Sequence, residues 1–296
     1  MNWKALLKSQ GYLVADGAMG TQLILRGLPP GTPPEAWNLE NPDAVADVAR
    51  AYVEAGARIV LTNTLGGTRI KLERPGLADR TAEVNRAATE AARRGAGDRA
   101  AVFASVGPTG EFMAPLGTRS EAEFIDAFAE QIAACADAGV EGICIETMTA
   151  LEEALAALKA ARQVCDLPVV VSMTFDHGPK GFATMMGVTP EGAARALEAA
   201  GADIIGSNCG NGIDGHVEVA RLLRPATRLP VWIKSNAGRP ELMDGETVFR
   251  ETPEQMAAHV PALLAAGANI IGGCCGTTPE HIRAMADAVH RYEPRA

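Results

Sequence analysis

Two adjacent cysteines, Cys274 and Cys275, close an apolar run near the C-terminal end of the chain, in the sequence Gly272-Gly273-Cys274-Cys275-Gly276. The peptide bond between them resists the geometry of an ordinary disulfide, so the pair is better suited to holding one metal ion. A third cysteine, Cys209, ends another apolar run. Three thiolates with one open position are a catalytic arrangement for Zn²⁺. The pattern predicts an open zinc site made by Cys209, Cys274 and Cys275.

A bare Cys-Cys pair is more often two small buried residues, and only Cys209 at a second strand end favours the metal. The other cysteines, Cys135, Cys144 and Cys165, fall in helical or strand-like segments, and we expect them to be packing residues.

Three thiolates around a divalent ion make a poor Lewis acid for water but a good site for one more sulfur ligand. A substrate thiol, with an ordinary pKa near ~8.5, would lose its proton there as a zinc thiolate and attack an activated methyl carbon. Asp16 and Glu146 each follow an apolar run and are candidates for binding a substrate ammonium. Their alternative role is to cap helices.

The elements that must position these residues follow a repeated pattern of helix end, glycine and buried strand. The pattern occurs at 54–60, 137–143, 199–205 and 265–271, and further apolar runs occur at 12–15, 101–104, 168–173 and 230–233. Helical patterns separate them at 42–55, 121–138, 150–164, 190–200 and 252–266. Eight such units in a chain of 296 residues predict an α/β fold, a (β/α)8 TIM barrel, as a single domain over 1–296. An open doubly wound sheet would instead carry a glycine-rich phosphate fingerprint after its first strand, and the sequence has none.

Catalytic groups of such a barrel lie at the C-terminal ends of the strands. These ends read Asp16-Gly17, Thr62-Asn63-Thr64, Ser105-Val106-Gly107-Pro108, Glu146-Thr147, Thr174, Asn208-Cys209, Ser235-Asn236 and Cys274-Cys275. We therefore expect these polar side chains to converge on one face.

Composition excludes several classes of function. The formal charge of −9 disfavours nucleic acid, and no apolar run is long enough to span a membrane. The N-terminus lacks the apolar core of a signal peptide, so we expect a cytoplasmic location, where cysteines remain thiols.

Five motifs resemble the zinc-dependent homocysteine S-methyltransferase family, which includes the homocysteine-binding module of cobalamin-dependent methionine synthase and betaine–homocysteine methyltransferase. They are Asp16-Gly17-Ala18-Met19-Gly20-Thr21, Thr62-Asn63-Thr64, Ser207-Asn208-Cys209, Asn236-Ala237-Gly238 and the segment 272–279. The resemblance spans essentially the whole chain. It implies a homocysteine-binding barrel that methylates homocysteine to methionine.

The resemblance also implies roles for individual residues. Cys209, Cys274 and Cys275 would bind Zn²⁺, and Asp16 and Glu146 would hold the amino group of homocysteine. Backbone around Gly17 and Ser105-Val106-Gly107 would line the pocket. Asn208 and Asn236 are further candidates for the substrate site, and the side-chain oxygen of Asn236 is a candidate fourth metal ligand before substrate arrives.

The methyl donor is expected to be methylcobalamin on a separate corrinoid protein. The chain ends at Ala296 soon after the cysteine motif, and Asp176-His177-Gly178, which we interpret as a loop, departs from the spacing of a corrinoid signature. The alternative donors are betaine, a sulfonium compound such as dimethylsulfoniopropionate, and S-methylmethionine. A quaternary ammonium usually needs an aromatic box, and Leu65-Gly66-Gly67-Thr68 offers no aromatic side chain, although Trp37 could approach the mouth.

Two rival functions remain open. One is a non-catalytic zinc or thiol-binding barrel whose metal is closed off by a fourth protein ligand. The other is an aldolase or sugar-phosphate isomerase, which is disfavoured because Lys234, the only strand-borne lysine, has no phosphate loop beside it.

Overall fold

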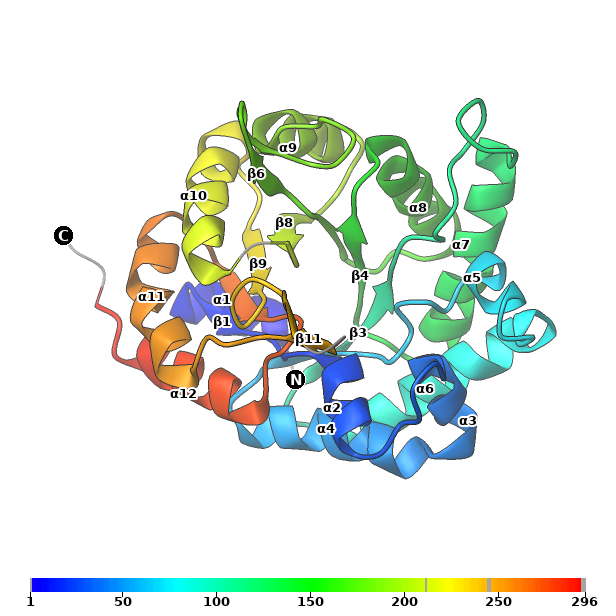
Figure 1. The fold of residues 1–296 in the computed structure, drawn as a ribbon, viewed down its shortest axis with the longest axis horizontal. Coiled ribbons are helices and arrows are strands. Elements are labelled where there is room, and N and C mark those ends of the chain that lie inside the picture. The colour runs from blue at the N-terminus through cyan, green and yellow to red at the C-terminus, as the bar shows by residue number, and fades with distance from the viewer. Residues whose placement is uncertain (1, 211, 244–245, 294–296) are drawn as a thin grey trace.

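Eight parallel strands form one sheet that closes into a barrel (Figure 1). The computed structural model describes residues 2–210, 212–243 and 246–293. The strands are β1 Leu13–Val14, β2 Ile59–Leu61, β3 Ala101–Val106, β4 Gly142–Met148, β5 Val169–Met173, β8 Ile204–Asn208, β9 Val231–Ser235 and β12 Ile270–Gly273. Their order is β1-β12-β9-β8-β5-β4-β3-β2, and a parallel bridge between Ala15 and Ile59 joins the two outer strands. The predicted (β/α)8 barrel, with all of its predicted strands, is confirmed.

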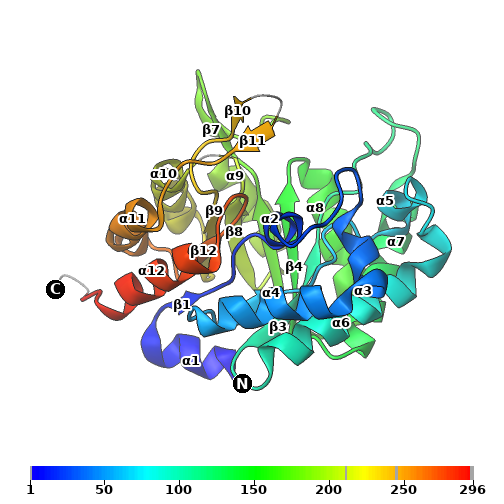
Figure 2. The ribbon, with the colours of Figure 1, turned by 60° about the horizontal axis from the view of Figure 1, so that its bottom comes forward.

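Helices surround the barrel (Figures 1 and 2). They are α1 Trp3–Gln10, α2 Met19–Leu25, α3 Trp37–Glu40, α4 Pro42–Glu54, α5 Arg69–Glu73, α6 Thr81–Ala96, α7 Glu121–Asp137, α8 Leu151–Val164, α9 Pro190–Ala199, α10 Ile213–Leu223, α11 Pro253–Ala265 and α12 Pro279–His290, with short 3₁₀ turns at Pro34–Ala36, Ala78–Arg80 and Arg224–Ala226. Helices α9 and α11 begin as their Thr-Pro signals predict, because Thr189 and Thr252 cap them and proline fills the first helical position. None of these described helices is long and apolar enough to cross a membrane.

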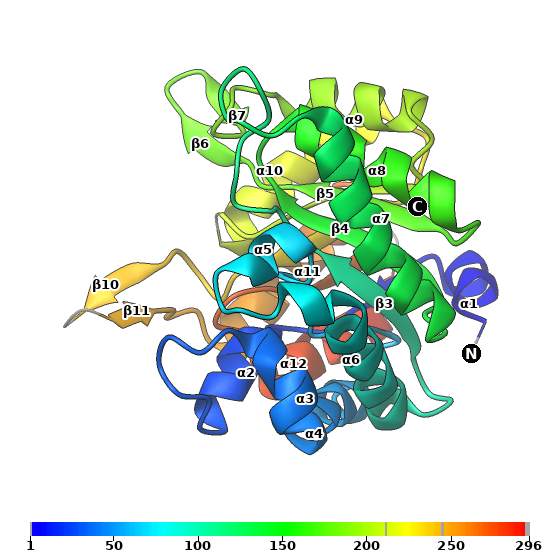
Figure 3. The same ribbon diagram turned by 90° about the vertical axis from the view of Figure 1, so that its right-hand side faces the viewer.

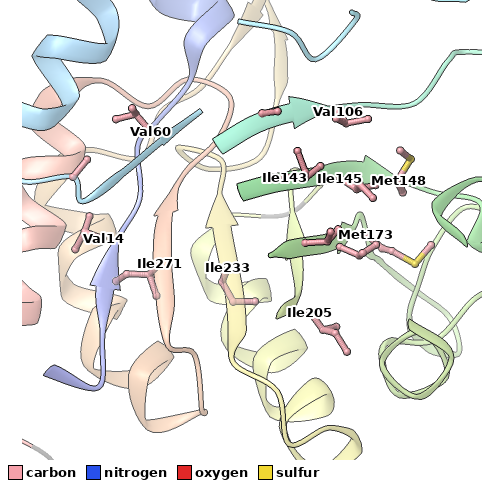
Figure 4. Close-up of a cluster of buried hydrophobic side chains, with 14 of the residues drawn as sticks. Val14, Val60, Val106, Ile143, Ile145, Met148, Met173, Ile205, Ile233 and Ile271 are labelled. Carbon is pink, nitrogen blue, oxygen red and sulfur yellow. The ribbon is translucent and has the colours of Figure 1, made fainter. Parts of the chain in front are cut away.

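Successive side chains of each strand point to opposite faces of the sheet, so the barrel has two layers of buried apolar side chains, one on each face. Val14, Val60, Ile205, Ile233 and Ile271 belong to the large cluster between strands and helices (Figure 4). Their neighbours in sequence, including Leu13, Ile59, Ile204, Trp232 and Ile270, fill the barrel interior together with Trp3 of α1. The ring of Trp3 packs edge-on against Phe103, with 5.2 Å between centroids, so α1 plugs the N-terminal end of the barrel. The other end is left for the site.

Two small antiparallel hairpins extend beyond the strands at that other end (Figures 2 and 3). One pairs β6 Asp176–Gly178 with β7 Gly181–Ala183, and the second pairs β10 Glu241–Met243 with β11 Glu246–Val248. The interpretation of Asp176-His177-Gly178 as a loop was therefore wrong. Its side chains are exposed or half-buried, so it lacks the apolar pattern that marks a strand, and Gly181, with φ +97°, permits the tight turn.

Candidate metal centre

The three predicted zinc ligands come together at the C-terminal end of the barrel. Cys209 follows β8, and Cys274 and Cys275 follow β12, with β9 between these strands. The Sγ atom of Cys209 lies 2.9 Å from that of Cys274 and 3.8 Å from that of Cys275. All three sulfur atoms lie within 4.8 Å of one another. The predicted convergence of these thiols is confirmed.

This donor set fits a zinc ion. Three soft sulfur atoms match the preference of Zn²⁺, and Zn–S bonds of about 2.3 Å in a tetrahedron place sulfur atoms about 3.8 Å apart. The Cys209–Cys275 separation of 3.8 Å equals that edge, and the Cys209–Cys274 contact is closer. Hydrogen bonds from Cys209 and Cys274 lower the pKa of Cys275, whereas hydrogen bonds with Cys274 and Cys275 raise the pKa of Cys209. The contacts therefore favour the thiolate form of Cys275 over those of Cys209 and Cys274.

Backbone geometry sets the direction of these thiols. Cys209 has φ +60°, in the left-handed region that side chains other than glycine rarely adopt. Its N–H donates to the carbonyl of Lys234 over 3.3 Å, and the N–H of Cys274 donates to that of Ser235 over 2.7 Å. Strand β9 thus supports both cysteine-bearing turns, and an uncommon backbone conformation is retained at Cys209, a predicted metal ligand.

Asn236 ties the two cysteine turns together. Its Oδ1 accepts from the N–H of Cys275 over 3.1 Å, and its Nδ2 donates to the carbonyl of Gly210 over 3.1 Å. The side-chain oxygen therefore already has an intramolecular partner next to the thiols. Its roles as a fourth metal ligand and as a substrate contact stay predictions.

Asn208 makes an equally dense set of contacts. Its Oδ1 accepts from Ser172 Oγ over 2.6 Å and from the N–H of Thr147 over 2.9 Å. Its Nδ2 donates to Thr147 Oγ1 over 2.8 Å and lies 3.8 Å from Cys274 Sγ. These contacts orient an N–H donor towards the sulfur of Cys274. The predicted contact of Asn208 with substrate is a separate matter and stays a prediction.

Gly17 is required where the end of β1 packs against the turn after β12. A Cβ atom there would lie 2.7 Å from both Thr277 Oγ1 and Tyr52 Cε1. This close approach lets Tyr52 donate to the carbonyl of Ala18 over 2.9 Å. It also holds the preceding residue, Asp16, whose carbonyl accepts from the N–H of Gly273.

Three buried charged residues lie beneath the thiols, and we call them the floor of the site: Asp16, Glu146 and Lys234. Lys234 Nζ lies 2.6 Å from Asp16 Oδ1, and their side chains are 4% and 2% exposed. The other oxygen of Asp16 accepts from the N–H of Leu61 over 2.7 Å. Ser105 Oγ donates to Glu146 Oε1 over 2.6 Å. The structure thus brings Asp16, Ser105 and Glu146 to one place, and adds Lys234, which was not among the residues predicted for this site.

The charges of this floor influence one another. Burial, together with the charges of Cys274 and Asp16, raises the pKa of Glu146 to about 7, although Lys234 opposes this. Burial disfavours the charged form of Lys234, but the negative charges of Asp16, Glu146 and Cys274 outweigh it and raise the pKa of the lysine. Lys234 is therefore a permanent cation beneath the thiols.

The remaining cysteines are packing residues, as predicted. Cys135 and Cys144 are buried in the core, and burial raises the pKa of Cys135 to about 12. Cys165, at the end of α8, is half-buried and hydrogen-bonds the carbonyl of Ala161.

A closed (β/α)8 barrel with three thiols above buried carboxylates defines a class of proteins, the barrels with a cluster of cysteine thiols at the mouth. Within that class, the chain matches the homocysteine S-methyltransferase family over residues 13–289. The chain therefore belongs to the homocysteine S-methyltransferase family, in agreement with its motifs.

Similar proteins include two mycobacterial methionine synthases. The chain is 35% identical over 302 residues to that of Mycobacterium tuberculosis (strain ATCC 25618 / H37Rv), covering 95% of this chain and 25% of that protein. It is 34% identical over 304 residues to that of Mycobacterium leprae (strain TN), covering 96% and 25%. The chain thus spans about a quarter of the length of these relatives.

Solved structures share the fold. The metallated form of the homocysteine methyltransferase MmuM from Escherichia coli superposes with a TM-score of 0.81 at 24% identity, covering 96% of this chain and 98% of that one. The oxidised form of MmuM gives a TM-score of 0.79 at 25% identity, with the same coverage.

Proposed function

We propose that the protein is a zinc-dependent S-methyltransferase that methylates homocysteine to methionine. The observation that carries this proposal is the cluster of Cys209, Cys274 and Cys275, with sulfur atoms within 4.8 Å of one another at the mouth of the barrel. Three protein ligands leave one tetrahedral position for the acceptor sulfur. Membership of the homocysteine S-methyltransferase family supports homocysteine as that acceptor.

Different residues of the site have different proposed roles in metal binding, positioning and substrate binding. The three cysteines would hold Zn²⁺, which when bound supplies a Lewis-acid site where a thiol loses its proton near neutral pH. Asn236 and Asn208 fix the cysteine turns through the contacts described above. The carboxylates of Glu146 and Asp16 lie below, where they suit an ammonium group, and backbone at Gly17 and Ser105 would line the pocket.

The proposed methyl transfer is balanced in atoms and in electrons. The acceptor sulfur forms the new bond to the methyl carbon with its own electron pair, and the thiol proton passes to solvent. The donor keeps the electron pair of the broken methyl bond. The thioether product carries no charge on sulfur, so the product is a weaker metal ligand than the deprotonated acceptor, which favours its release.

For the donor, we favour methylcobalamin carried by a separate corrinoid protein, acting in the cytoplasm. The similarity to methionine synthases supports this choice. The burial of Trp3, Trp37 and Trp232, each no more than 8% exposed, disfavours an aromatic box for betaine. S-methylmethionine and other sulfonium compounds are the competing donors.

A donor panel tests the proposal. Purified zinc-loaded protein is given homocysteine with betaine, dimethylsulfoniopropionate, S-methylmethionine, free methylcobalamin or a methylated corrinoid protein, and methionine is quantified. Turnover should be lost in Cys275→Ala and retained in the matched control Cys165→Ala, which removes a thiol outside the cluster.

A spectroscopic measurement separates this enzyme from a non-catalytic zinc barrel. Cobalt in place of zinc reports a new sulfur ligand through its charge-transfer absorption. A cobalt spectrum that homocysteine leaves unchanged would overturn the proposed function and favour a metal closed off by a fourth protein ligand.

A further inference from the structure

Lys234 is a charged residue in the interior of the barrel. In β9 the side chain of Ile233 belongs to the layer under the helices, whereas Trp232 lies in the barrel interior. Alternation along the strand turns Lys234 inward with Trp232. The residue is 3% exposed, so its ammonium is held away from solvent and needs a nearby anion.

The neighbouring strand allows the lysine side chain to reach that anion. In the sheet β9 is followed by β12 and then β1, and the register partner of Lys234 on β12 is Gly272. Because Gly272 carries no side chain, the lysine can cross β12 to Asp16, which follows β1. A Cβ atom at Gly272 would lie 2.8 Å from the carbonyl oxygen of Asp16, which shows how closely the backbones pack there.

Each oxygen of the Asp16 carboxylate already accepts a hydrogen bond within the protein. Lys234 donates to Oδ1 over 2.6 Å and Leu61 donates to Oδ2 over 2.7 Å. A second ammonium brought to this carboxylate would stand beside the lysine. Two like charges 4 Å apart repel by about 4 kcal/mol at an effective dielectric constant of 20, which cancels much of what Asp16 would contribute.

The carboxylate of Glu146 has a different environment. Its Oε1 accepts from Ser105, and Oε2 accepts no hydrogen bond from any residue that the structure describes. No cation in the described chain lies against it in an ion pair. Lys234 is in direct contact with Asp16 and acts on Glu146 only through its charge, which lowers the pKa of that carboxyl, so Glu146 is the carboxylate that no cation of the described residues contacts.

We propose that Lys234 is a specificity-determining residue that neutralises Asp16 and directs the amino group of the thiol acceptor to Glu146 alone. The inference rests on the proposed function, because it concerns the acceptor bound at the same metal centre. It refines the expectation that Asp16 and Glu146 share the ammonium. Lys234 takes the place at Asp16 that a second ammonium would otherwise occupy.

The test compares two thiols that differ in the ammonium. Cobalt-substituted protein is titrated with homocysteine and with 4-mercaptobutanoate, which lacks the amino group, at a pH above 7, where Glu146 is ionised. The preference is the ratio of the two dissociation constants. It needs no methyl donor and no turnover, so it is independent of the donor's identity.

Each variant has a distinct expected result. Glu146→Gln should reduce the preference for homocysteine by about tenfold or more, since a hydrogen bond to a charged group contributes about 1.5–3 kcal/mol. Asp16→Asn should change it less than about threefold. Lys234→Met should raise the preference about tenfold, because Asp16 then becomes a second free carboxylate. This variant is compared at a pH high enough to keep Glu146 ionised, because loss of the lysine charge raises the pKa of Glu146 further. Lys159→Met, at an exposed lysine, is the control and should leave the preference unchanged.

Two results would overturn the inference. An Asp16→Asn protein that loses as much preference as Glu146→Gln would assign the ammonium to Asp16. A Lys234→Met protein that binds both thiols more weakly by the same factor would make Lys234 a ligand of their shared carboxylate. If Lys234→Met does not fold, the comparison of Asp16→Asn with Glu146→Gln still decides. If neither thiol changes the spectrum of the unmodified protein, the proposed function fails instead.

Discussion

Breaking the buried ion pair between Lys234 and Asp16 should destabilise the barrel strongly. The two charged atoms are 2.6 Å apart and almost wholly buried, so solvent screens them little. Lys234→Met leaves the carboxylate of Asp16 without its cation. Asp16→Asn leaves the ammonium of Lys234 without its anion. Replacing both residues removes both charges, so the double variant should regain most of what each single variant loses.

The geometry sets the size of the effect. At 2.6 Å and an effective dielectric constant of 20, the Coulomb attraction has an upper limit of about 6 kcal/mol. Removing one partner of a buried pair ordinarily costs about 3–5 kcal/mol, while replacing both is often close to neutral. We therefore expect each single variant to lose about 3 kcal/mol or more of unfolding free energy, and the coupling between the two changes to be about 3 kcal/mol.

Urea unfolding, followed by circular dichroism, measures the unfolding free energy of four metal-free proteins: the unmodified protein, Lys234→Met, Asp16→Asn and the double variant. The four values together give the coupling energy between the two residues. Lys159→Met again serves as the control for removing an exposed lysine. The reasoning is refuted if Lys234→Met alone costs under about 1 kcal/mol, or if the costs of the two single variants simply add in the double variant.

Three further outcomes are expected. Cys275→Ala should lose bound zinc on dialysis while Cys165→Ala retains one equivalent, as measured by metal analysis; equal zinc contents would contradict the assignment. The pKa of Glu146 is raised from 4.5 to about 7, so the unfolded chain releases this proton first and the stability of metal-free protein should fall by about 3 kcal/mol between those pH values. That part of the pH dependence should vanish in Glu146→Gln, and an unaltered slope would argue against it. Gly206→Ala should lower stability by about 3 kcal/mol in thermal unfolding, because its Cβ would lie 2.1 Å from the carbonyl oxygen of Trp232; an unchanged melting temperature would contradict this packing.

Most strands and helices of the barrel could be predicted because the local sequence pattern of each unit agrees with its place in the fold. A glycine that ends a helix and a following β-branched run mark each unit, as at Gly201 before β8 and Gly267 before β12, where φ is +93° and +106°. Once the strands are assigned, the barrel itself brings their C-terminal ends together, and Cys209 meets Cys274 and Cys275 for that reason.

Other features depend on contacts between strands that no local pattern records. Lys234 was visible as a lysine inside an apolar strand, but its partner depends on the register that sets it beside Gly272. The contacts of Asn208 with Ser172 and Thr147 likewise join three different strands or strand ends. The hairpin at Asp176 was missed because exposed pairs carry no hydrophobic alternation.

The order of the metal ligands along the chain has a consequence for synthesis on the ribosome. All three cysteines follow residue 208, and Lys234 emerges 218 positions after its partner Asp16. Strands β1 to β5 are therefore synthesised before any of the three cysteines. Strand β1 lacks its partner on one side until β12 is synthesised, and Cys274 and Cys275 follow β12 directly. Assembly of the three thiols and closure of the barrel therefore both wait until β12 has been made and has paired with β1.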